Sequence, residues 1–270
     1  MGTSASHSGP KPGVSFDPPW LDDIDNPETL EVPKQSPKEA PVAPLLAPPA
    51  RFRSARQNLG DYIKSGSRES LRKSLGHYSR TGMGGARNVA NRMRHSASIA
   101  SKLYSSFSLL REGNEPTISS IISSYRTEKT DVYGMIDAIA GFICGDGGSL
   151  DETSPINSVS SALSDLFDKN PDIDIAALSD DNVWSLVSSF LSYEAFSKIQ
   201  LDIGQGFEAK DIPLADRITR LNDMREYLES EISSQVNDIR SELGAKLPSN
   251  LQNVMMTAIE RTFKVFEVTE

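Results

Sequence analysis

The spacing of apolar residues predicts helices along most of the chain after about residue 50. In the segment 68–80, Leu71, Leu75 and Tyr78 recur at steps of four and three residues, which places them on one face of a helix. Ser67 is a suitable N-cap, and Gly82 is the expected stop. We therefore expect an amphipathic helix over 68–80.

From Ala86 onward two apolar stripes run together and predict a helix with a broad buried face. One stripe comprises Val89, Met93, Ala97, Ala100 and Tyr104, and the other comprises Ile99, Leu103, Phe107 and Leu110. Similar spacing predicts helices around 117–126, 131–144, 156–169 and 180–201. Alternation of the kind that marks strands is hardly seen, so the expected fold class is all-α.

The longest predicted helix begins after Pro213. Its apolar positions keep alternating steps of three and four residues: Leu214, Ile218, Leu221, Leu228, Ile232, Val236, Ile239 and Leu243. This pattern resembles about four heptads, with Arg225 in the apolar seam. Such a helix packs within its own chain or joins a second copy, and the pattern leaves both open. Gly244 and Pro248 should end it, and a last helix is expected at about 249–265.

Proline separates the beginning of the chain from the rest. Eleven of the 16 prolines lie before residue 51. Because proline lacks the amide donor and fixes φ, residues 1–50 are expected to be a disordered arm without a core. A basic helical region, 51–112, and an acidic helical region, 113–270, then form one multi-helix domain with a long C-terminal helix.

Charge is distributed unevenly along these regions. Residues 51–111 carry 13 basic residues against Asp61 and Glu69, although the whole chain has a net charge of −9. The basic region either packs against the acidic one or forms a surface for a polyanion, a nucleotide or an acidic partner. Arg68 and Arg72 lie one helical turn apart, and Arg87 and Arg94 two turns apart, which would suit contacts to nucleic-acid phosphates.

Residues with catalytic chemistry are scarce. The single cysteine, Cys144, ends an apolar helix and is expected to be a buried structural residue. His77 and His95 lack metal-ligand spacing, and the glycines at 82–85 lack the lysine and hydroxyl of a phosphate-binding loop. We therefore expect no enzyme activity, metal or cofactor of the chain's own. The longest apolar stretch is about half of the roughly 20 residues that span a membrane, so a soluble cytoplasmic protein is expected.

The N-terminus offers one reactive group. Removal of Met1 would expose the α-amine of Gly2, whose pKa near 8 leaves part of it neutral and nucleophilic. Glycine has no side chain, so a narrow active site would admit it. The same residues fit a myristoylation pattern. Trp20, further along the arm, would anchor in a pocket of a partner or against the chain's own helical domain.

Two separated blocks of the sequence carry a recognisable pattern. The first block is Met1-Gly2-Thr3-Ser4, then Ser8-Gly9-Pro10 and Pro18-Pro19-Trp20. The second runs through Arg51-Phe52, Ala55-Arg56, Leu59-Gly60, Ser65-Gly66-Ser67-Arg68, Leu71-Arg72, Gly76-His77-Tyr78, Arg80-Thr81-Gly82 and Gly84-Gly85. In this order the two blocks resemble the QatB family, the B component of the Qat antiphage-defence system. The acidic C-terminal half carries no motif that matches.

The resemblance implies a non-enzymatic component that acts beside an ATPase, a QueC-like enzyme of the QatC type and a TatD-like nuclease. QueC enzymes use ATP to make a 7-deazaguanine nitrile, and their defence relatives are implied to attach a deazaguanine to a partner's N-terminal glycine. Gly2 would then be bound or modified, with ATP and the deazaguanine in the partner's active site. The alternative is a basic helical nucleic-acid-binding or scaffold subunit of the same complex.

Candidate partner-binding residues follow from this interpretation. In the arm they are Thr3, Ser4, Gly9, Pro10, Pro18, Pro19 and Trp20. In the predicted docking helix and its glycine turn they are Arg68, Arg72, His77, Tyr78, Arg80, Gly82, Gly84 and Gly85.

Overall fold

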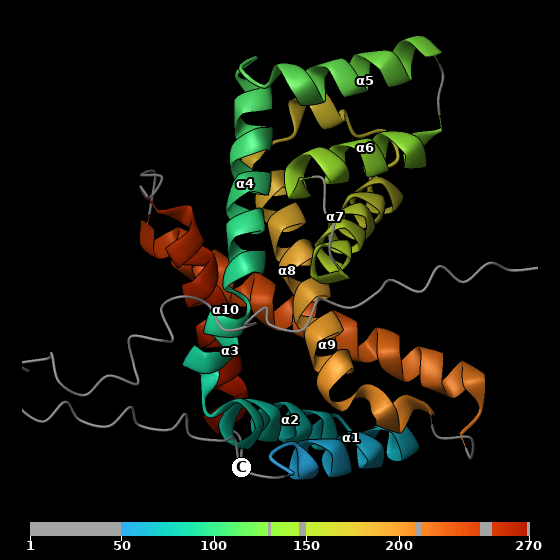
Figure 1. The fold of residues 1–270 in the computed structure, drawn as a ribbon, viewed down its shortest axis with the longest axis vertical. Coiled ribbons are helices and arrows are strands. Elements are labelled where there is room, and N and C mark those ends of the chain that lie inside the picture. Colours follow the sequence, from blue (N-terminus) through green and yellow to red (C-terminus); the bar gives the residue numbers. More distant parts are fainter. Residues whose placement is uncertain (1–49, 129–130, 146–149, 209–211, 244–249, 269–270) are drawn as a thin grey trace, which may run out of the picture. The chain divides into compact units, whose positions relative to one another are not determined.

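Helices are the only regular secondary structure in the described part of the chain, so the prediction of an all-α fold is confirmed. The structure is a computed structural model, and it describes residues 50–128, 131–145, 150–208, 212–243 and 250–268. These residues belong to one compact unit, 47–270. Ten α-helices lie in them (Figure 1): α1 Arg53–Ser65, α2 Arg68–His77, α3 Ala86–Arg92, α4 Arg94–Arg111, α5 Pro116–Glu128, α6 Val132–Cys144, α7 Leu150–Lys169, α8 Asp180–Ile203, α9 Leu214–Leu243 and α10 Leu251–Val268.

Local sequence signals set several helix ends. The hydroxyl of Ser67 accepts a hydrogen bond from the backbone N–H of Ser70, 3.3 Å away, and caps α2 as predicted. Ser179 caps α8 in the same way through Asn182, at 3.2 Å. Gly66 ends α1 in the left-handed conformation, at φ 71°, which favours glycine.

Helix α8 is the centre of the core. Apolar side chains run around most of its circumference, and a helix of that kind must be surrounded by other elements. It packs against α4, α7 and α9 (Figure 1). Its fully buried residues include Val183, Leu186, Val187, Phe190 and Leu191. The two predicted apolar stripes lie on α3 and α4 and at Met93 between them, and all nine of their side chains are buried: Val89, Met93, Ala97, Ala100, Tyr104, Ile99, Leu103, Phe107 and Leu110.

Helix α9 follows the predicted bounds, but its apolar seam is only partly covered. The side chains from Met224 to Ile239 that face α8 and α10 are buried, whereas Leu214 and Ile218 are exposed. The seam therefore begins to pack one turn or more after the helix starts. The packing that the structure describes is within the chain.

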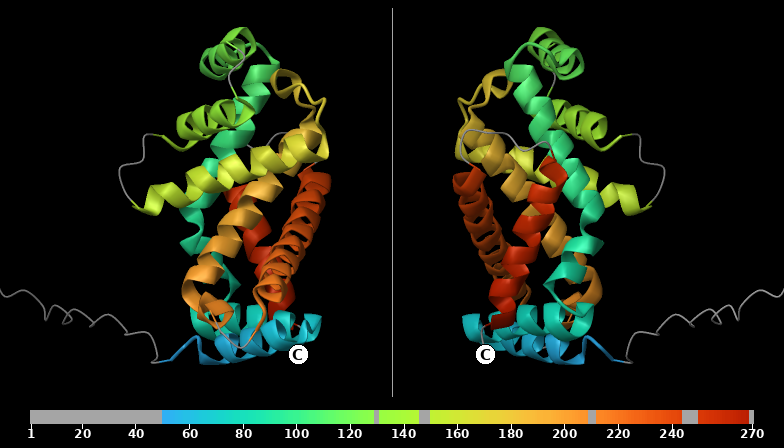
Figure 2. Two further views of the ribbon diagram at one scale, coloured as in Figure 1. Left: turned by 90° about the vertical axis from the view of Figure 1, so that its right-hand side faces the viewer. Right: turned by 90° about the vertical axis from the view of Figure 1, so that its left-hand side faces the viewer.

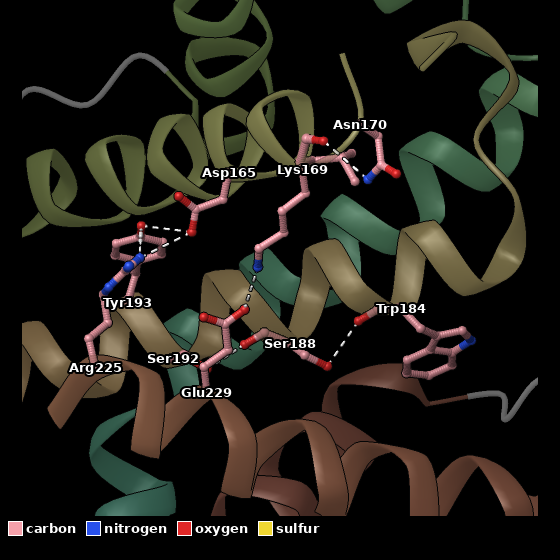
Figure 3. Close-up of polar contacts among 10 residues, drawn as sticks. Asp165, Lys169, Asn170, Trp184, Ser188, Ser192, Tyr193, Arg225 and Glu229 are labelled. Atoms are coloured by element: carbon pink, nitrogen blue, oxygen red, sulfur yellow. Dashed lines mark hydrogen bonds and ion pairs between the residues drawn. The ribbon is translucent and has the colours of Figure 1, made fainter. Parts of the chain in front are cut away.

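Arg225 interrupts the seam because it has polar partners there. Its Nη1 lies 3.1 Å from Oδ2 of Asp165 on α7, and its guanidinium stacks over the ring of Tyr193 on α8 at 4.9 Å. The Tyr193 hydroxyl also donates to Asp165, at 2.9 Å. Figure 3 shows these three side chains pointing toward one another, with the ion pair of Lys169 and Glu229 beside them. They join α7, α8 and α9 by a polar contact at the edge of the core.

Helix α7 begins at Leu150, where a start near residue 156 was expected, and two predicted boundaries between residues 68 and 111 are also wrong. The α-helix that begins after Ser67 ends at His77, and a π-helical turn over Tyr78–Met83 continues it. The stop is Gly84, in the left-handed conformation at φ 77°, and not Gly82. The helix expected from Ala86 is divided at Met93 into α3 and α4. Neither change moves an apolar residue out of the core.

Helix α10 packs back onto α2, α3, α4 and α9 (Figures 1 and 2). Gly76 on α2 makes the closest approach, because a Cβ atom there would lie 2.6 Å from the carbonyl oxygen of Phe266. The rings of Phe263 and Phe266 pack edge to face, and Phe263 also contacts Tyr78. The C-terminal end of α10 is thereby held against the end of α2.

Candidate functional site

The predicted docking helix has one face in the core and one face outside. Leu71, Leu75 and Gly76 are buried, while Arg68 is exposed and Arg72 and His77 are half-buried. The arm residues fall outside the described part of the chain: Gly2, Thr3, Ser4, Gly9, Pro10, Pro18, Pro19 and Trp20. Of the two sets of candidate residues, the described part of the chain therefore contains only the predicted docking helix and its glycine turn.

Tyr78 is an interior residue, which corrects its placement on a docking face. It is 1% exposed, and its ring stacks on Phe52 with centroids 5.6 Å apart. Its hydroxyl donates to Oδ2 of Asp202 at 2.9 Å, while Arg92 pairs with Oδ1 at 2.8 Å. Burial, and next the Asp202 charge, raise the pKa of Tyr78 well above its ordinary value. The basic region meets the acidic region at this contact, which joins the π-helical turn and α3 to α8.

Gly82 is buried as well and does not belong to an exposed turn. A Cβ atom at this position would lie 2.4 Å from two carbons of the Phe52 ring, so a larger residue would displace that ring. Gly84 and Gly85, by contrast, lie at or near the surface and turn the chain at φ 77° and 112° into α3. Of the glycine turn, the part from Gly84 onward is accessible.

Arg80 is exposed at the junction between the π-helical turn and the end of α10. Its guanidinium donates to the backbone carbonyl of Glu267. The neighbouring Ser79 hydroxyl donates to the Glu267 carboxylate at 2.6 Å. Arg80 therefore has a structural partner in the described residues and presents only part of its surface to a docking protein.

A pocket of about 400 Å³ lies beside the exposed face of α2, against α9, and we call it the α2–α9 pocket. Its lining comprises Tyr62, Gly66, Arg68, Leu71, Asp223, Glu226, Tyr227 and Ser230. It combines one guanidinium, two carboxylates, two phenols and a hydroxyl around an apolar floor. Charged and hydrogen-bonding groups around aromatic side chains are features of many surfaces that bind proteins.

The two phenols of this pocket are held as neutral donors. The Tyr62 hydroxyl donates to the carbonyl oxygen of Arg220 at 2.8 Å. Burial, and next the charge of Asp223, raise the pKa of Tyr62 to about 12. Burial and the nearby Glu231 also raise the pKa of Tyr227. Sequence reasoning missed the α9 residues of this pocket, because about 150 positions separate them from α2.

Sequence reasoning also missed a buried polar cluster around Glu194 on α8. This side chain is completely buried and accepts hydrogen bonds from three hydroxyls. Ser96 on α4 donates at 2.6 Å, and Ser154 and Ser158 on α7 donate at 3.0 and 2.8 Å. The available signal was a single acidic residue within an otherwise apolar stretch of helix.

Catalytic or metal chemistry has little support in the described residues. Within the described ranges, no group of three or more His, Cys, Asp or Glu side chains could hold a metal ion. Cys144 is half-buried, where full burial was expected, and burial followed by the charge of Glu194 raises the pKa of its thiol to about 11. A thiol of this kind is a poor nucleophile near neutral pH. None of the described helices combines the length and apolar character that crossing a membrane requires.

The comparison with protein families decides which family this helical chain represents. The model of the family described as "Qat anti-phage system associated protein QatB" matches residues 84–266, more than half of the chain. The chain belongs to the QatB family. No match was found among curated proteins, nor among solved structures.

Membership of the QatB family confirms the resemblance and places the chain in an anti-phage defence system. The matched segment begins where the second recognised block ends, at Gly84, and covers the acidic half in which no motif was apparent. It includes α3 to α9 and most of α10, so the family signal lies in the packed helices. Those helices carry apolar spacing and few unusual residues, which gives no short motif to recognise.

Proposed function

We propose that this chain is a non-enzymatic component of a bacterial antiphage-defence complex that docks on a QueC-like enzyme and presents Gly2 to it. The observation that carries the proposal is the α2–α9 pocket next to the exposed face of α2. The pocket combines charges of both signs with aromatic side chains, which supports binding of a protein partner, and the described residues include no group that could hold a metal ion. Gly2 lies outside those residues, and its part in the proposal rests on the free α-amine and on the family resemblance.

The pocket suits a protein partner for electrostatic reasons. Arg68 stands at one side of it, and Asp223 and Glu226 stand on α9 at the other. Arg220 lies 3.5 Å from Asp223, so charges of both signs alternate along the surface. A partner with complementary alternation would dock in one orientation, because like charges placed opposite one another are repulsive. A fixed orientation is what presentation of a terminal amine requires.

The cofactors of the reaction belong to the partner in this proposal. ATP and a 7-deazaguanine nucleobase would occupy the active site of the QueC-like enzyme, and this chain would supply Gly2 for binding or conjugation. The ATPase and the TatD-like nuclease of the system are further candidate partners. The complex would work in the cytoplasm, where phage nucleic acid is met.

Charge reversal in the pocket tests the docking step. Arg68→Glu and Glu226→Lys change exposed side chains of the lining, and Arg53→Glu on α1 is the matched control outside it. In co-purification with the tagged QueC-like enzyme, we expect the two pocket variants to retain about a tenth or less of the wild-type yield. The control should co-purify normally. Equal recovery of all three variants, with unchanged circular dichroism, would overturn the docking surface.

A second candidate, binding of nucleic acid through the basic region, has one observation in its favour. Arg87 on α3 and Arg94 on α4 are both exposed and border one pocket. Gel-shift assays with duplex DNA at low and physiological salt distinguish this function. Each phosphate contact steepens the slope of log affinity against log salt concentration by about one unit. Loss of every shift at physiological salt would leave protein docking as the function.

A further inference from the structure

A second pocket, of about 350 Å³, lies where α10 passes α3 and the start of α4 (Figure 1), and we call it the α3–α10 pocket. Arg87 and Arg94 contribute guanidinium groups from α3 and α4. Gln252 and Asn253 contribute amides from the first turn of α10. Its volume falls within the range of sites that bind small ligands, about 300–1,000 Å³.

The two sides of this pocket are fixed relative to each other. Gln252 Nε2 donates to the backbone carbonyl of Arg94 at 3.2 Å, which ties the start of α10 to the start of α4. Arg94 Nη2 lies 3.4 Å from the side-chain oxygen of Asn91, a long contact that leaves most of its donors available. The backbone of Arg94 is therefore held at the pocket while its guanidinium stays exposed, and Arg87 is exposed on α3.

The pocket has a net positive charge. Glu260 is the acidic side chain of its lining, and its Oε1 lies 3.0 Å from Nζ of Lys264. That ion pair offsets the carboxylate, so the charges of Arg87 and Arg94 are not cancelled by it. Guanidinium groups bind phosphate oxygens through paired hydrogen bonds, with a planar geometry that matches the anion.

The remaining lining suits a nucleobase. Asn91, Gln252 and Asn253 carry amides, which have both a donor and an acceptor and pair with the edges of bases. Ala90 and Met256 supply an apolar floor, and the polarisable thioether of methionine packs well against a flat ring. Phosphate-binding and base-binding groups thus stand within one cavity.

We infer that the α3–α10 pocket binds a nucleoside phosphate, with the phosphate between Arg87 and Arg94 and the base against the amides of α10. All of its lining lies within residues 84–266, the segment that the QatB family model matches. This site is separate from the α2–α9 pocket and does not depend on Gly2. The same chemistry is offered by a free nucleotide and by a nucleotide of a single strand.

Isothermal titration calorimetry on the purified full-length chain tests the site. The probes are AMP, adenosine as the matched ligand without phosphate, and a ten-nucleotide single-stranded DNA. Arg87→Ala and Arg94→Ala remove one guanidinium each, and Arg87→Lys keeps the charge but not the paired geometry. Arg53→Ala removes the same charge from α1, outside the pocket lining.

We expect saturable binding of AMP, with adenosine at least tenfold weaker. Each alanine variant should lose about tenfold in affinity, as for one charge-assisted hydrogen bond, and Arg53→Ala should stay within about twofold of wild type. Displacement of AMP by the DNA would assign a strand as the source of the phosphate, and no displacement would assign a free nucleotide. An equal loss in Arg53→Ala, or no saturable binding of either AMP or DNA, would overturn the proposal.

Discussion

Ser96 on α4 donates a hydrogen bond of 2.6 Å to Oε2 of Glu194 on α8, and both side chains are buried. The other carboxylate oxygen accepts from Ser154 and Ser158 on α7, and Lys198 lies 3.7 Å from Oε2. An unpaired carboxylate in this position would be strongly unfavourable, so the three hydroxyls and the ammonium compensate its burial. One side chain thereby fixes how α4, α7 and α8 pack against one another.

Replacement of Glu194 by alanine should destabilise the fold severely. The variant leaves the buried hydroxyls of Ser96 and Ser158 without their acceptor and opens a cavity, so we expect the free energy of unfolding to fall by about 3 kcal/mol. Urea denaturation followed by circular dichroism measures this change. Glu229→Ala, which breaks the more exposed ion pair with Lys169, is the control and should cost about 0–1 kcal/mol. Equal losses of stability in the two variants would contradict the role of buried Glu194 in joining α4, α7 and α8.

Two glycines should respond in opposite directions to the same substitution. A Cβ atom at Gly76 would lie 2.6 Å from the carbonyl oxygen of Phe266, so Gly76→Ala must push α10 away and destabilise the fold. Gly60 lies within α1 and has no atom within 4 Å of its Cβ position. Gly60→Ala should therefore stabilise the protein by about 0.5–1 kcal/mol.

Thermal unfolding of these two variants provides the measurement. A higher midpoint for Gly60→Ala and a lower one for Gly76→Ala are expected. A Gly76→Ala variant as stable as the wild type would show that α10 does not approach α2 as closely as the structure places it.

Stability should decline in alkaline solution because of Tyr62. The pKa of its phenol is raised from 10.0 to about 12 in the fold, so above pH 10 the unfolded chain releases this proton more readily than the folded chain. The free energy of unfolding should therefore fall as pH rises from 10 toward 12. Tyr62→Phe removes the titrating group, and its hydrogen bond to Arg220, and should show a shallower decline.

Urea denaturation at a series of pH values across this range gives the slope. The matched control is Tyr133→Phe, which removes an exposed tyrosine from α6. Equal flattening in both variants, or none in Tyr62→Phe, would contradict the assignment to Tyr62.

The helices of this fold could be predicted because their signals are local. Repeats of three and four residues mark the buried stripes of α4, and Ser67 identifies the start of α2 through its own side chain. The end of α2 could not be predicted in the same way. The π-helical turn follows from the packing of Tyr78 and Gly82 on Phe52, about 26 to 30 positions earlier in the chain.

Of the candidate site, the sequence could predict the exposure of single residues but not which distant residues lie beside them. Arg68 is exposed, and Arg87 and Arg94 border one pocket, although the helix expected to carry both is divided between them at Met93. Tyr78 and Gly82 belong to the sequence block that resembles the QatB family, but both are buried. Residues of a recognisable motif can pack in the interior as well as bind a partner. Asp223, Glu226 and Gln252 join their sites from distant helices, and sequence spacing carries no information on such contacts.

The exposed start of α9 is the remaining difference from the heptad prediction. Leu214 is 63% exposed and Ile218 is 49% exposed, although both continue the apolar seam. These two side chains lack the neighbours that cover the rest of the helix, whereas Leu221, one turn further on, is partly buried against the core. A heptad pattern records where a helix is able to pack, and only the tertiary structure shows where it does so.

Intact mass spectrometry with N-terminal peptide mapping, after co-expression with the QueC-like enzyme, tests whether Gly2 is modified by that enzyme. Gly2→Val and Gly13→Val form a matched pair, since both add the same side chain to the arm. We expect a mass gain of one deazaguanine on Gly2 in the wild type and in Gly13→Val, and no gain in Gly2→Val or without the enzyme. An unmodified Gly2 in a chain that is purified without the QueC-like enzyme attached, together with intact phage protection by a variant whose N-terminus is blocked, would contradict it.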